Sequence, residues 1–346
     1  MEILGVDIGF GFTKATNGRD ALIFKSVLGE ATELQFQEQI LQNPQGSEDH
    51  LRIEVDGKGY FVGELAERQS SNRFFTLDPT QLVGRFARIL ALTAASRLVG
   101  SYLPINLVTG LPIGYYRQHK EALNRALAGE HKILVQEAGG KKVEKTLSVN
   151  KVRIIPQPFG SLFNAMLNDS GELSDKRLVR EKIGIVDVGF RTSDYTISDR
   201  MRYSERGSRT TDSGIAKAFT AIANALREQS GVNIELYRLY DAVEKGSIKV
   251  RGKEFDLRET VEQAFNQLAT AVAAEVERLW ADDWDVDTIV VTGGGGAVLA
   301  PYLLPLIEGN VLPAEAGRDA RLNNVSGYWK FGRHLWAKGE LGAGSQ

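Results

Sequence analysis

Apolar runs alternate along the chain with segments of helical periodicity, and this alternation predicts an α/β protein. Buried strands are predicted at 3–8, 105–112, 152–155, 183–188 and 288–291, and returning strands at 12–15, 21–24 and 192–197. Helices are predicted at 81–99 and 115–127. Two further amphipathic helices present one apolar face from Ile215 to Leu226 and another from Phe265 to Leu279.

Turn chemistry divides the pattern into repeating units. Asn17–Gly18 and Asp56–Gly57 favour tight hairpin turns. The second turn lies in a hairpin at 51–63, which follows an irregular polar stretch from about Gly29 to Asp49. The strand–Asp–x–Gly–turn–strand unit that opens the chain recurs at 183–197, so we expect two α/β domains that duplicate one structure.

Composition narrows the class of function. The chain has 346 residues, 42% apolar and 25% charged, which suits two globular domains. A net charge of −2 gives no electrostatic case for direct binding to nucleic acid or to a membrane surface. There are no cysteines, and the four histidines lack ligand spacing, so a zinc site is not expected. The acidic start and the lack of a long apolar run predict a cytoplasmic protein.

The first candidate phosphate loop is GVDIGFGFTK at 5–14. A strand delivers Asp7 to its C-terminal end, where Gly9 and Gly11 let backbone N–H groups approach phosphate oxygens. Thr13 could add a hydroxyl and Lys14 a point charge, while the Asp7 carboxylate suits hydrated magnesium. Taken alone, the segment is more typical of an ordinary glycine hairpin with a surface aspartate.

The second candidate loop is GIVDVGFRTSDYTI at 184–197, which repeats D-x-G-F at Asp187 and Gly189. Thr192 supplies another hydroxyl, and alternation along the returning strand predicts that Asp194 points to the same side. Two loops that begin at Asp7 and Asp187 could hold one polyphosphate from both sides of a cleft. Their agreement favours a phosphate site over two unrelated hairpins.

Two further elements fit a nucleotide site. Four glycines, Gly293 to Gly296, follow a buried strand, where bare backbone could accept a flat ligand and the next helix offers N–H donors. The alternative is a flexible glycine linker. Gln157 lies between two prolines, where a rigidly placed amide could orient an attacking water; the alternative is a polar residue in a proline-rich turn.

Together with NVSGYWKFG at 324–332, these elements resemble the actin–chaperone–sugar kinase ATPase superfamily. Within it, the chain is most similar to bacterial and archaeal actin-like proteins of the ParM/StbA plasmid-segregation type. The motifs follow in the family's order over nearly the whole chain. The resemblance implies two RNase H-like domains around a nucleotide cleft. Domain I would span 1–158, with a small inserted subdomain at about 29–80, and be completed by 324–346; domain II would span 159–323.

The resemblance also implies roles for individual residues. The first phosphate motif corresponds to Asp7, Gly9, Gly11, Thr13 and Lys14, and the second to Asp187, Gly189, Arg191 and Thr192. Asp7 and Asp187 would hold Mg²⁺ through water. Gln157 would position the hydrolytic water, with Asp194 as a helper and Asp187 as part of the catalytic set. The nucleoside would contact Gly214, Lys217, Gly293, Gly294, Gly295 and Gly296. Many ParM-like proteins carry glutamate where this chain has Gln157, whereas actins carry glutamine.

The implied function is an ATPase that binds Mg-ATP (or GTP) and self-associates into filaments for plasmid or DNA partition. A separate adaptor protein would supply the DNA contact, because the chain lacks a basic patch. The hairpin at 51–63 lies where relatives make filament contacts, although a solvated surface hairpin explains it nearly as well. Two alternatives stay open: a small-molecule kinase of the same superfamily and a non-polymerising actin-fold adaptor. No membrane anchor or separate chaperone domain is expected.

Overall fold

The computed structural model describes residues 1–32, 51–136, 141–313 and 319–341, with side chains of the last segment described to Trp336. The chain divides into two compact units. Unit 1 comprises Met1–Leu111, Tyr115–Leu173 and Asn324–Gln346, and unit 2 comprises Pro112–Gly114 and Ser174–Asn323. Unit 2 is thus almost a single continuous segment, whereas unit 1 is assembled from three.

Unit 1 is built on a ten-stranded mixed sheet with the order β3-β2-β1-β8-β10-β9-β5-β6-β4-β7. Its strands are β1 (Glu2–Ile8), β2 (Phe12–Thr16), β3 (Ala21–Lys25), β4 (Leu28–Glu30), β5 (Arg52–Val55), β6 (Lys58–Val62), β7 (Arg73–Phe74), β8 (Pro104–Leu111), β9 (Gly129–Gln136) and β10 (Lys142–Pro156). Strand β1, the third in this order, pairs antiparallel with β2 and parallel with β8. Every residue from Leu4 to Ile8 is buried, so side chains on both faces of the strand are covered.

Five α-helices complete unit 1 among the described residues: α1 (Glu64–Gln69), α2 (Arg85–Leu98), α3 (Ile113–Leu127), α4 (Phe159–Met166) and α9 (Asn323–Leu341), with a 3₁₀ helix, η2 (Pro79–Val83), before α2. The apolar helix α2 packs against β1 and β2. The helix α9 returns to β1 from the far end of the chain, and a Cβ on Gly5 would lie 2.6 Å from the Val325 carbonyl oxygen. The helices α4 and α9 cross closely, since a Cβ on Gly327 would lie 1.7 Å from the Gly160 carbonyl oxygen.

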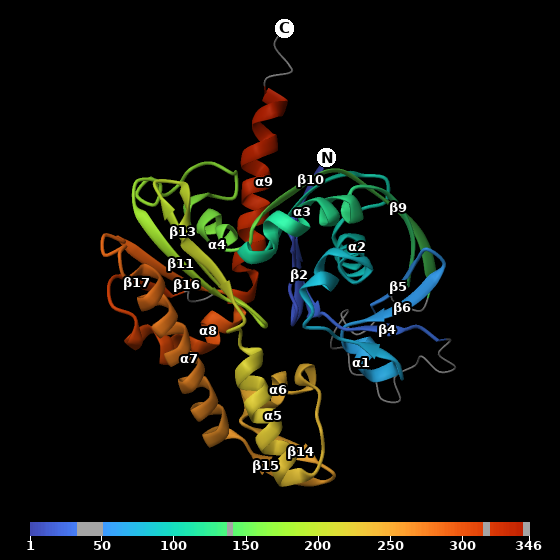
Figure 1. Ribbon diagram of the computed structural model, residues 1–346. Coiled ribbons are helices and arrows are strands. Elements are labelled where there is room, and N and C mark those ends of the chain that lie inside the picture. The colour runs from blue at the N-terminus through green and yellow to red at the C-terminus, as the bar shows by residue number, and fades with distance from the viewer. Residues whose placement is uncertain (33–50, 137–140, 314–318, 342–346) are drawn as a thin grey trace. The chain divides into compact units, whose positions relative to one another are not determined.

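Unit 2 is built on a five-stranded sheet with the order β13-β12-β11-β16-β17, beside a two-stranded sheet of β14 and β15. Its strands are β11 (Lys182–Val188), β12 (Ser193–Asp199), β13 (Arg202–Thr211), β14 (Ser247–Val250), β15 (Lys253–Asp256), β16 (Thr288–Thr292) and β17 (Val311–Pro313). Its helices are α5 (Ala216–Ser230), α6 (Tyr240–Lys245), α7 (Arg258–Trp280) and α8 (Gly294–Leu303), with 3₁₀ helices η3 (Leu236–Arg238), η4 (Leu304–Leu306) and η5 (Ala320–Leu322). Figure 1 shows α5 and α7 extending from this sheet toward β14 and β15.

The two units repeat one strand arrangement. The first five neighbours in unit 1, β3-β2-β1-β8-β10, and the whole sheet of unit 2, β13-β12-β11-β16-β17, both follow the order 3-2-1-4-5. In each unit, strands 1, 2 and 3 form an antiparallel meander. Strands 4 and 5 run parallel to strand 1. The duplication inferred from the Asp–x–Gly units therefore extends to the backbone of both units.

Most predicted elements are present, with two differences in extent; several further elements, among them β9, β13, the β14–β15 hairpin and α9, were not predicted. The helix predicted at 81–99 begins at Arg85, because Pro79–Val83 forms a separate 3₁₀ helix. The strand predicted at 152–155 is the end of the 15-residue strand β10. Strand β9 was missed, although its buried His131, Ile133 and Val135 alternate with more exposed residues. Most of the polar stretch at about 29–49 lies outside the described residues.

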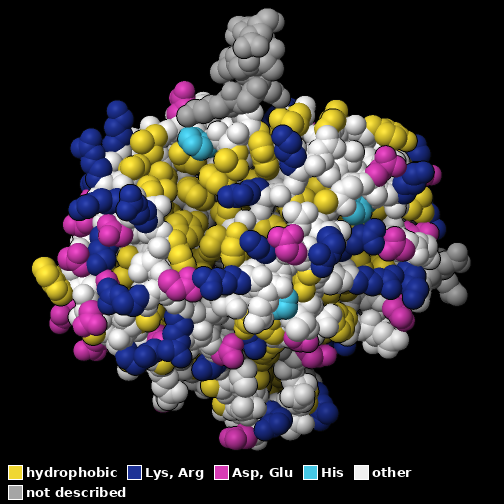
Figure 2. Space-filling view, turned by 45° about the horizontal axis from the view of Figure 1, so that its top comes forward, with side chains coloured by type: hydrophobic (Ala, Val, Ile, Leu, Met, Phe, Trp, Pro, Cys, Tyr) yellow, Lys and Arg dark blue, Asp and Glu magenta, His cyan; other side chains and the backbone are white. Residues whose placement is uncertain are grey.

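The surface gives no concentration of one charge on the face in Figure 2, where basic and acidic side chains are interspersed. This mixture agrees with the formal net charge of −2. No helix within the described ranges combines the length and the apolar character needed to cross a bilayer.

Candidate functional site

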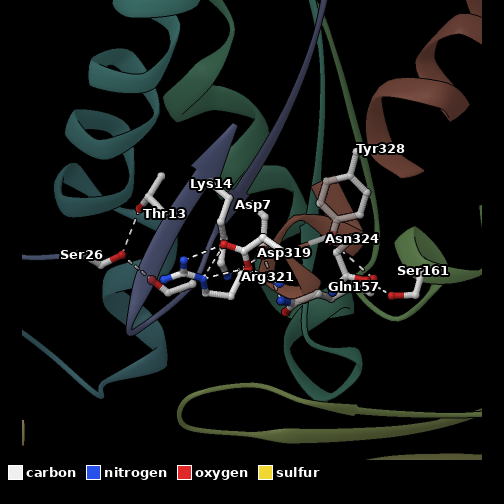
Figure 3. A network of polar contacts seen from close by, with 11 residues as sticks. Asp7, Thr13, Lys14, Ser26, Gln157, Ser161, Asp319, Arg321, Asn324 and Tyr328 are labelled. Atoms are coloured by element: carbon white, nitrogen blue, oxygen red, sulfur yellow. Dashed lines mark hydrogen bonds and ion pairs between the residues drawn. The ribbon is translucent and has the colours of Figure 1, made fainter. Parts of the chain in front are cut away.

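The first Asp–Gly hairpin joins β1 to β2 and buries a charge pair. Asp7 lies opposite Lys14 in the antiparallel register. The Lys14 Nζ atom lies 2.8 Å from the Asp7 Oδ2 atom, with side-chain exposures of 13% and 3%. Because both groups are largely removed from water, each depends on the other for compensation of its charge. Figure 3 shows the two side chains pointing toward one another.

The turn of this hairpin is held by its own backbone and by Ser26, a residue that the sequence did not single out. The Gly9 amide donates to the Phe12 carbonyl oxygen at 3.2 Å, and the Ser26 amide donates to the Gly11 carbonyl oxygen at 2.9 Å. The Ser26 hydroxyl donates to the Gly9 carbonyl oxygen at 2.6 Å and lies 2.9 Å from the Thr13 hydroxyl. The predicted phosphate donor Thr13 is therefore already hydrogen-bonded within unit 1 (Figure 3).

Gln157 joins this hairpin from the end of β10. The parallel strands β1, β8 and β10 deliver their carboxyl ends to one edge of the sheet, which is where such sheets present functional groups. The backbone amide of Gln157 donates to the Leu111 carbonyl oxygen at 2.9 Å. Its side-chain Nε2 donates to the Asp7 Oδ1 atom at 3.2 Å. Unit 1 thus brings together three predicted site residues, Asp7, Lys14 and Gln157, although 150 positions separate the first from the last.

The second hairpin, between β11 and β12, places two acids opposite each other. Asp187 pairs with Asp194 in the register, and the Gly189 amide donates to the Thr192 carbonyl oxygen at 2.9 Å. Asp194 is 2% exposed and accepts hydrogen bonds from the Ile113 amide at 2.9 Å and from the Thr210 hydroxyl. Burial, together with the charge of Asp187, raises the pKa of Asp194 to about 7. Asp194 can therefore hold or release a proton near neutral pH.

The strand register also shows which residues of the two loops occupy equivalent positions, and these differ from the pairing inferred from the sequence. Thr13 lies one residue before Lys14, and the equivalent residue before Asp194 is Ser193, not Thr192. Ser193 is fully buried and its hydroxyl donates to the Ser213 carbonyl oxygen at 2.8 Å. The sequence did not single out Ser193, although counting the same number of residues from each Asp–Gly pair would have found it.

The N-terminus of α5 packs onto the second loop. The Gly214 amide donates to the Arg191 carbonyl oxygen at 2.9 Å, and the Ala216 amide donates to the Phe190 carbonyl oxygen at 2.7 Å. A Cβ on Gly214 would lie 2.2 Å from the Arg191 carbonyl carbon, so this contact requires glycine. Arg191 pairs with Asp212 at 2.9 Å. Lys217, in the first turn of α5, is exposed.

The glycine run packs partly onto Asp187. Gly293 has a φ of 85° and precedes α8, so only the last three of the four glycines are helical. A Cβ on Gly293 would lie 2.3 Å from the Asp187 Oδ1 atom, and one on Gly295 would lie 2.8 Å from the Val188 carbonyl oxygen. Close packing against β11 therefore accounts for these two glycines. Gly296 has more room, with its nearest contact at 3.4 Å.

Arg321 covers the remaining glycine and was not singled out from the sequence. A Cβ on Gly294 would lie 3.1 Å from the Arg321 Cγ atom. The guanidinium of Arg321 makes an ion pair with Asp319, with its closest contact at 2.6 Å. Unit 2 thus gathers the second Asp–Gly loop, the start of α5, the glycine run and Arg321 into one polar region.

Two family models match the chain. Residues 5–160 match the N-terminal domain of actin-like proteins, and residues 185–304 match the C-terminal domain of archaeal MreB-like actin homologues. No curated protein sequence matches the chain.

Solved structures give the same result at the level of the fold. A non-polymerisable quadruple mutant of pCBH ParM is 25% identical, with a TM-score of 0.79, over 96% of this chain and 99% of that one. A subunit of a 15-stranded ParM filament from Clostridium botulinum is 24% identical, with a TM-score of 0.81 and the same coverage. The archaeal actin homologue Ta0583 in complex with ADP is 17% identical, with a TM-score of 0.76, over 95% of this chain and 98% of that one. The predicted actin-like, two-domain α/β fold is confirmed.

Proposed function

Because the chain is an actin-like protein of the ParM type, we propose that it is an ATPase that binds Mg-ATP through both Asp–Gly loops and assembles into filaments. The observation that carries this proposal is the repeated hairpin, which sets a buried carboxylate at the same register position in both units. The similar proteins support each half of the proposal: one is a ParM filament and another is an ADP complex of an archaeal actin homologue.

The donor set fits a hydrated magnesium ion. Asp7 and Asp187 are carboxylates with exposures of 2% and 3%. The described residues include no group of three or more His, Asp or Glu side chains that could hold a metal ion. Magnesium commonly takes one or two carboxylates, several waters and the phosphate oxygens of its nucleotide. Bound in this way, it would neutralise phosphate charge, with Asp7 and Asp187 as its protein partners through water.

The remaining site residues take complementary roles in the proposal. Lys14, which neutralises Asp7 in this structure, would also attract the terminal phosphates. The side-chain Nε2 atom of Gln157 donates to Asp7, so the Oε1 atom of the same side chain would be available to orient a water for attack. Asp194 would accept a proton from that water, since its pKa of about 7 suits a group that gains and loses protons near neutral pH. The glycine run, Gly214, Lys217 and Arg191 would bind the nucleoside and phosphates of ATP or GTP.

Partition of plasmid or other DNA is the proposed process, on the basis of the similarity to ParM proteins. The protein would act in the cytoplasm, and a separate adaptor would bind the DNA. The mixed charges in Figure 2 and the net charge of −2 give the chain itself no broad basic surface on the face shown.

Sedimentation and electron microscopy of the purified protein with ATP, ADP and a non-hydrolysable analogue test the proposal. We expect polymer with ATP and with the analogue, and release of phosphate with ATP. The Asp187→Ala variant should lose at least about 100-fold in turnover, which corresponds to about 3 kcal/mol. Asp199→Ala, which removes an exposed carboxylate from the other end of β12, is the matched control. Wild-type protein that stays monomeric with every nucleotide would overturn the filament, and normal turnover in Asp187→Ala would overturn the site.

A further inference from the structure

The hydroxyl groups of Thr13 and Ser26 form two consecutive hydrogen bonds beside the first Asp–Gly turn, and the direction of each bond follows from the chemistry of its partners (Figure 3). A hydroxyl has one proton to donate, and a carbonyl oxygen can only accept. The Ser26 hydroxyl therefore donates to the Gly9 carbonyl oxygen at 2.6 Å. The contact of 2.9 Å between the two hydroxyls must then be donated by Thr13. Both side chains have no exposed surface, so the Thr13 proton is used inside unit 1.

Ser26 also holds both carbonyl groups of the glycine turn. Its hydroxyl binds the Gly9 carbonyl oxygen, and its backbone amide donates to the Gly11 carbonyl oxygen at 2.9 Å. The peptide bonds of the described residues are trans, and in a trans peptide unit the C=O and N–H groups point in opposite directions. The N–H groups of Phe10 and Phe12 belong to these same two peptide units. They therefore point away from Ser26.

The ammonium group of Lys14 lies beside the same turn. A Cβ on Gly9 would lie 3.1 Å from the Lys14 Nζ atom. Backbone N–H groups gathered in a turn make a concave donor set for an anion, and an ammonium adds a point charge to it. The turn thus combines the two kinds of group that bind phosphate oxygens.

The residues on either side of Ser26 are both tied to helix α1. Lys25 is 8% exposed and pairs with two glutamates of this helix, at 2.8 Å and 2.9 Å. The Val27 carbonyl oxygen accepts a hydrogen bond at 2.9 Å from the amide of Gly63, the residue that precedes α1. A hydroxyl placed between two anchored residues is preorganised for the contact that it makes.

We propose that Ser26 is the positioning residue of the first phosphate loop, and that Thr13 acts through Ser26 rather than on the phosphate. Ser26 holds two carbonyl groups on one side of the turn, so that the N–H groups of Phe10 and Phe12 meet phosphate oxygens on the other side. The inference rests on the proposed nucleotide site. It assigns the phosphate contacts of the first loop to backbone donors and Lys14.

Binding of a non-hydrolysable Mg-ATP analogue, measured below the protein concentration at which polymer forms, tests the role of Ser26. Ser26→Ala should raise the dissociation constant about tenfold, because Gly9 and Thr13 both lose their partner. Ser96→Ala is the matched control, since Ser96 is 1% exposed and donates its hydroxyl to the Thr93 carbonyl oxygen at 2.7 Å. The control should bind the analogue like wild type. Loss of folded protein lowers the number of sites in the titration and leaves the dissociation constant unchanged, so a structural defect is distinguished from a binding defect.

A double-mutant cycle tests whether Thr13 acts through Ser26. Thr13→Val removes the hydroxyl and should raise the dissociation constant about threefold in the wild-type background. In the Ser26→Ala background the same substitution should change it less than about 1.5-fold, because the serine that Thr13 orients is gone. Thr13→Ser keeps the hydroxyl and should bind like wild type.

Two results would overturn the inference and leave the proposed nucleotide site standing. Ser26→Ala protein that binds the analogue as tightly as wild type would exclude the positioning role. Equal effects of Thr13→Val in both backgrounds would show that Thr13 contacts phosphate directly. Wild-type protein that does not bind the analogue would overturn the proposed function and the inference together.

Discussion

The hairpins at Asp7 and Asp187 share a backbone and differ in charge. In both, the aspartate is the second-last residue of its strand, and the following glycine amide donates to the carbonyl oxygen three residues on, at 3.2 Å from Gly9 and 2.9 Å from Gly189. The cross-strand neighbour differs: Asp7 faces Lys14, whereas Asp187 faces Asp194. The D-x-G-F motif therefore determines the backbone path of each hairpin. The residue that faces the aspartate across the hairpin, Lys14 or Asp194, determines the local charge.

The two loops therefore differ in whether their buried charge is compensated within the loop. The first loop carries its own counter-ion at 2.8 Å. The second places two buried acids together and raises the pKa of Asp194 to about 7, so it gains from an added proton or an added cation. The first loop is thus neutral by itself, whereas the second attracts positive charge.

The largest expected effect comes from Gly293→Ala, because the backbone of Gly293 lies against the aspartate of the second loop. The new Cβ would lie 2.3 Å from the Asp187 Oδ1 atom, and the alanine would have to adopt the φ of 85° that Gly293 has. Overpacking and backbone strain together should lower the free energy of unfolding by about 4 kcal/mol. Urea unfolding measures this loss of free energy. Gly231→Ala has a similar φ of 69° with nothing within 4 Å, and should cost about 1 kcal/mol; equal losses would show that the contact with Asp187 is unimportant.

Lys14→Met tests whether the first loop depends on its counter-ion. The substitution keeps the aliphatic volume and leaves the buried Asp7 carboxylate without the lysine that lies 2.8 Å away. We expect a loss of about 3 kcal/mol in the free energy of unfolding. In an Asp7→Asn background the same substitution should cost less than about 1 kcal/mol, and the interaction energy from this double-mutant cycle measures the pair. An additive cycle would contradict the comparison.

Asp194→Asn tests the acid pair of the second loop through pH. The folded pKa of about 7 is above the ordinary aspartate pKa of 3.8, so the folded state holds more protons between these two pH values. The stability contributed by the protonated carboxyl is full below the unfolded pKa and is lost as pH rises through the folded pKa. Wild-type protein without nucleotide should therefore lose about 2 kcal/mol relative to Asp194→Asn between pH 5 and pH 7.5. Parallel pH profiles in chemical unfolding would argue against a raised pKa.

The smallest effect is expected from Gln157→Glu, which adds an acid to the first loop and so makes it resemble the second. The glutamine donates to Asp7 at 3.2 Å, and a carboxylate there would lose the hydrogen bond and repel the aspartate. Because Lys14 stays in place, we expect a loss of only about 1 kcal/mol at pH 8. Thermal unfolding with Gln157→Ala as the neutral control separates repulsion from the lost hydrogen bond. A variant as stable as wild type would show that Lys14 alone controls this charge.

The sequence was sufficient for the fold class and for the two hairpins, because buried strands and Asp–x–Gly turns are local patterns. It did not show that Lys14 and Asp194 occupy the same position, since this depends on the register across each hairpin. Nor did it find Ser26, which contacts the first loop, or Arg321, which packs on Gly294 of the glycine run, because these contacts arise from tertiary packing and follow no sequence motif. The glycine run was recognised by its composition, but the contact of Gly293 with Asp187 requires β11 and β16 to be neighbours.

The return of α9 to β1 has a consequence for synthesis of the chain. The helix supplies Val325 and Tyr328, both fully buried, to a unit whose strand β1 is translated before any part of unit 2. Unit 2 lies almost entirely between these segments, so it can be completed on the ribosome while unit 1 still lacks a wall of its core. Unit 1 therefore starts to be translated before unit 2 and finishes folding after it.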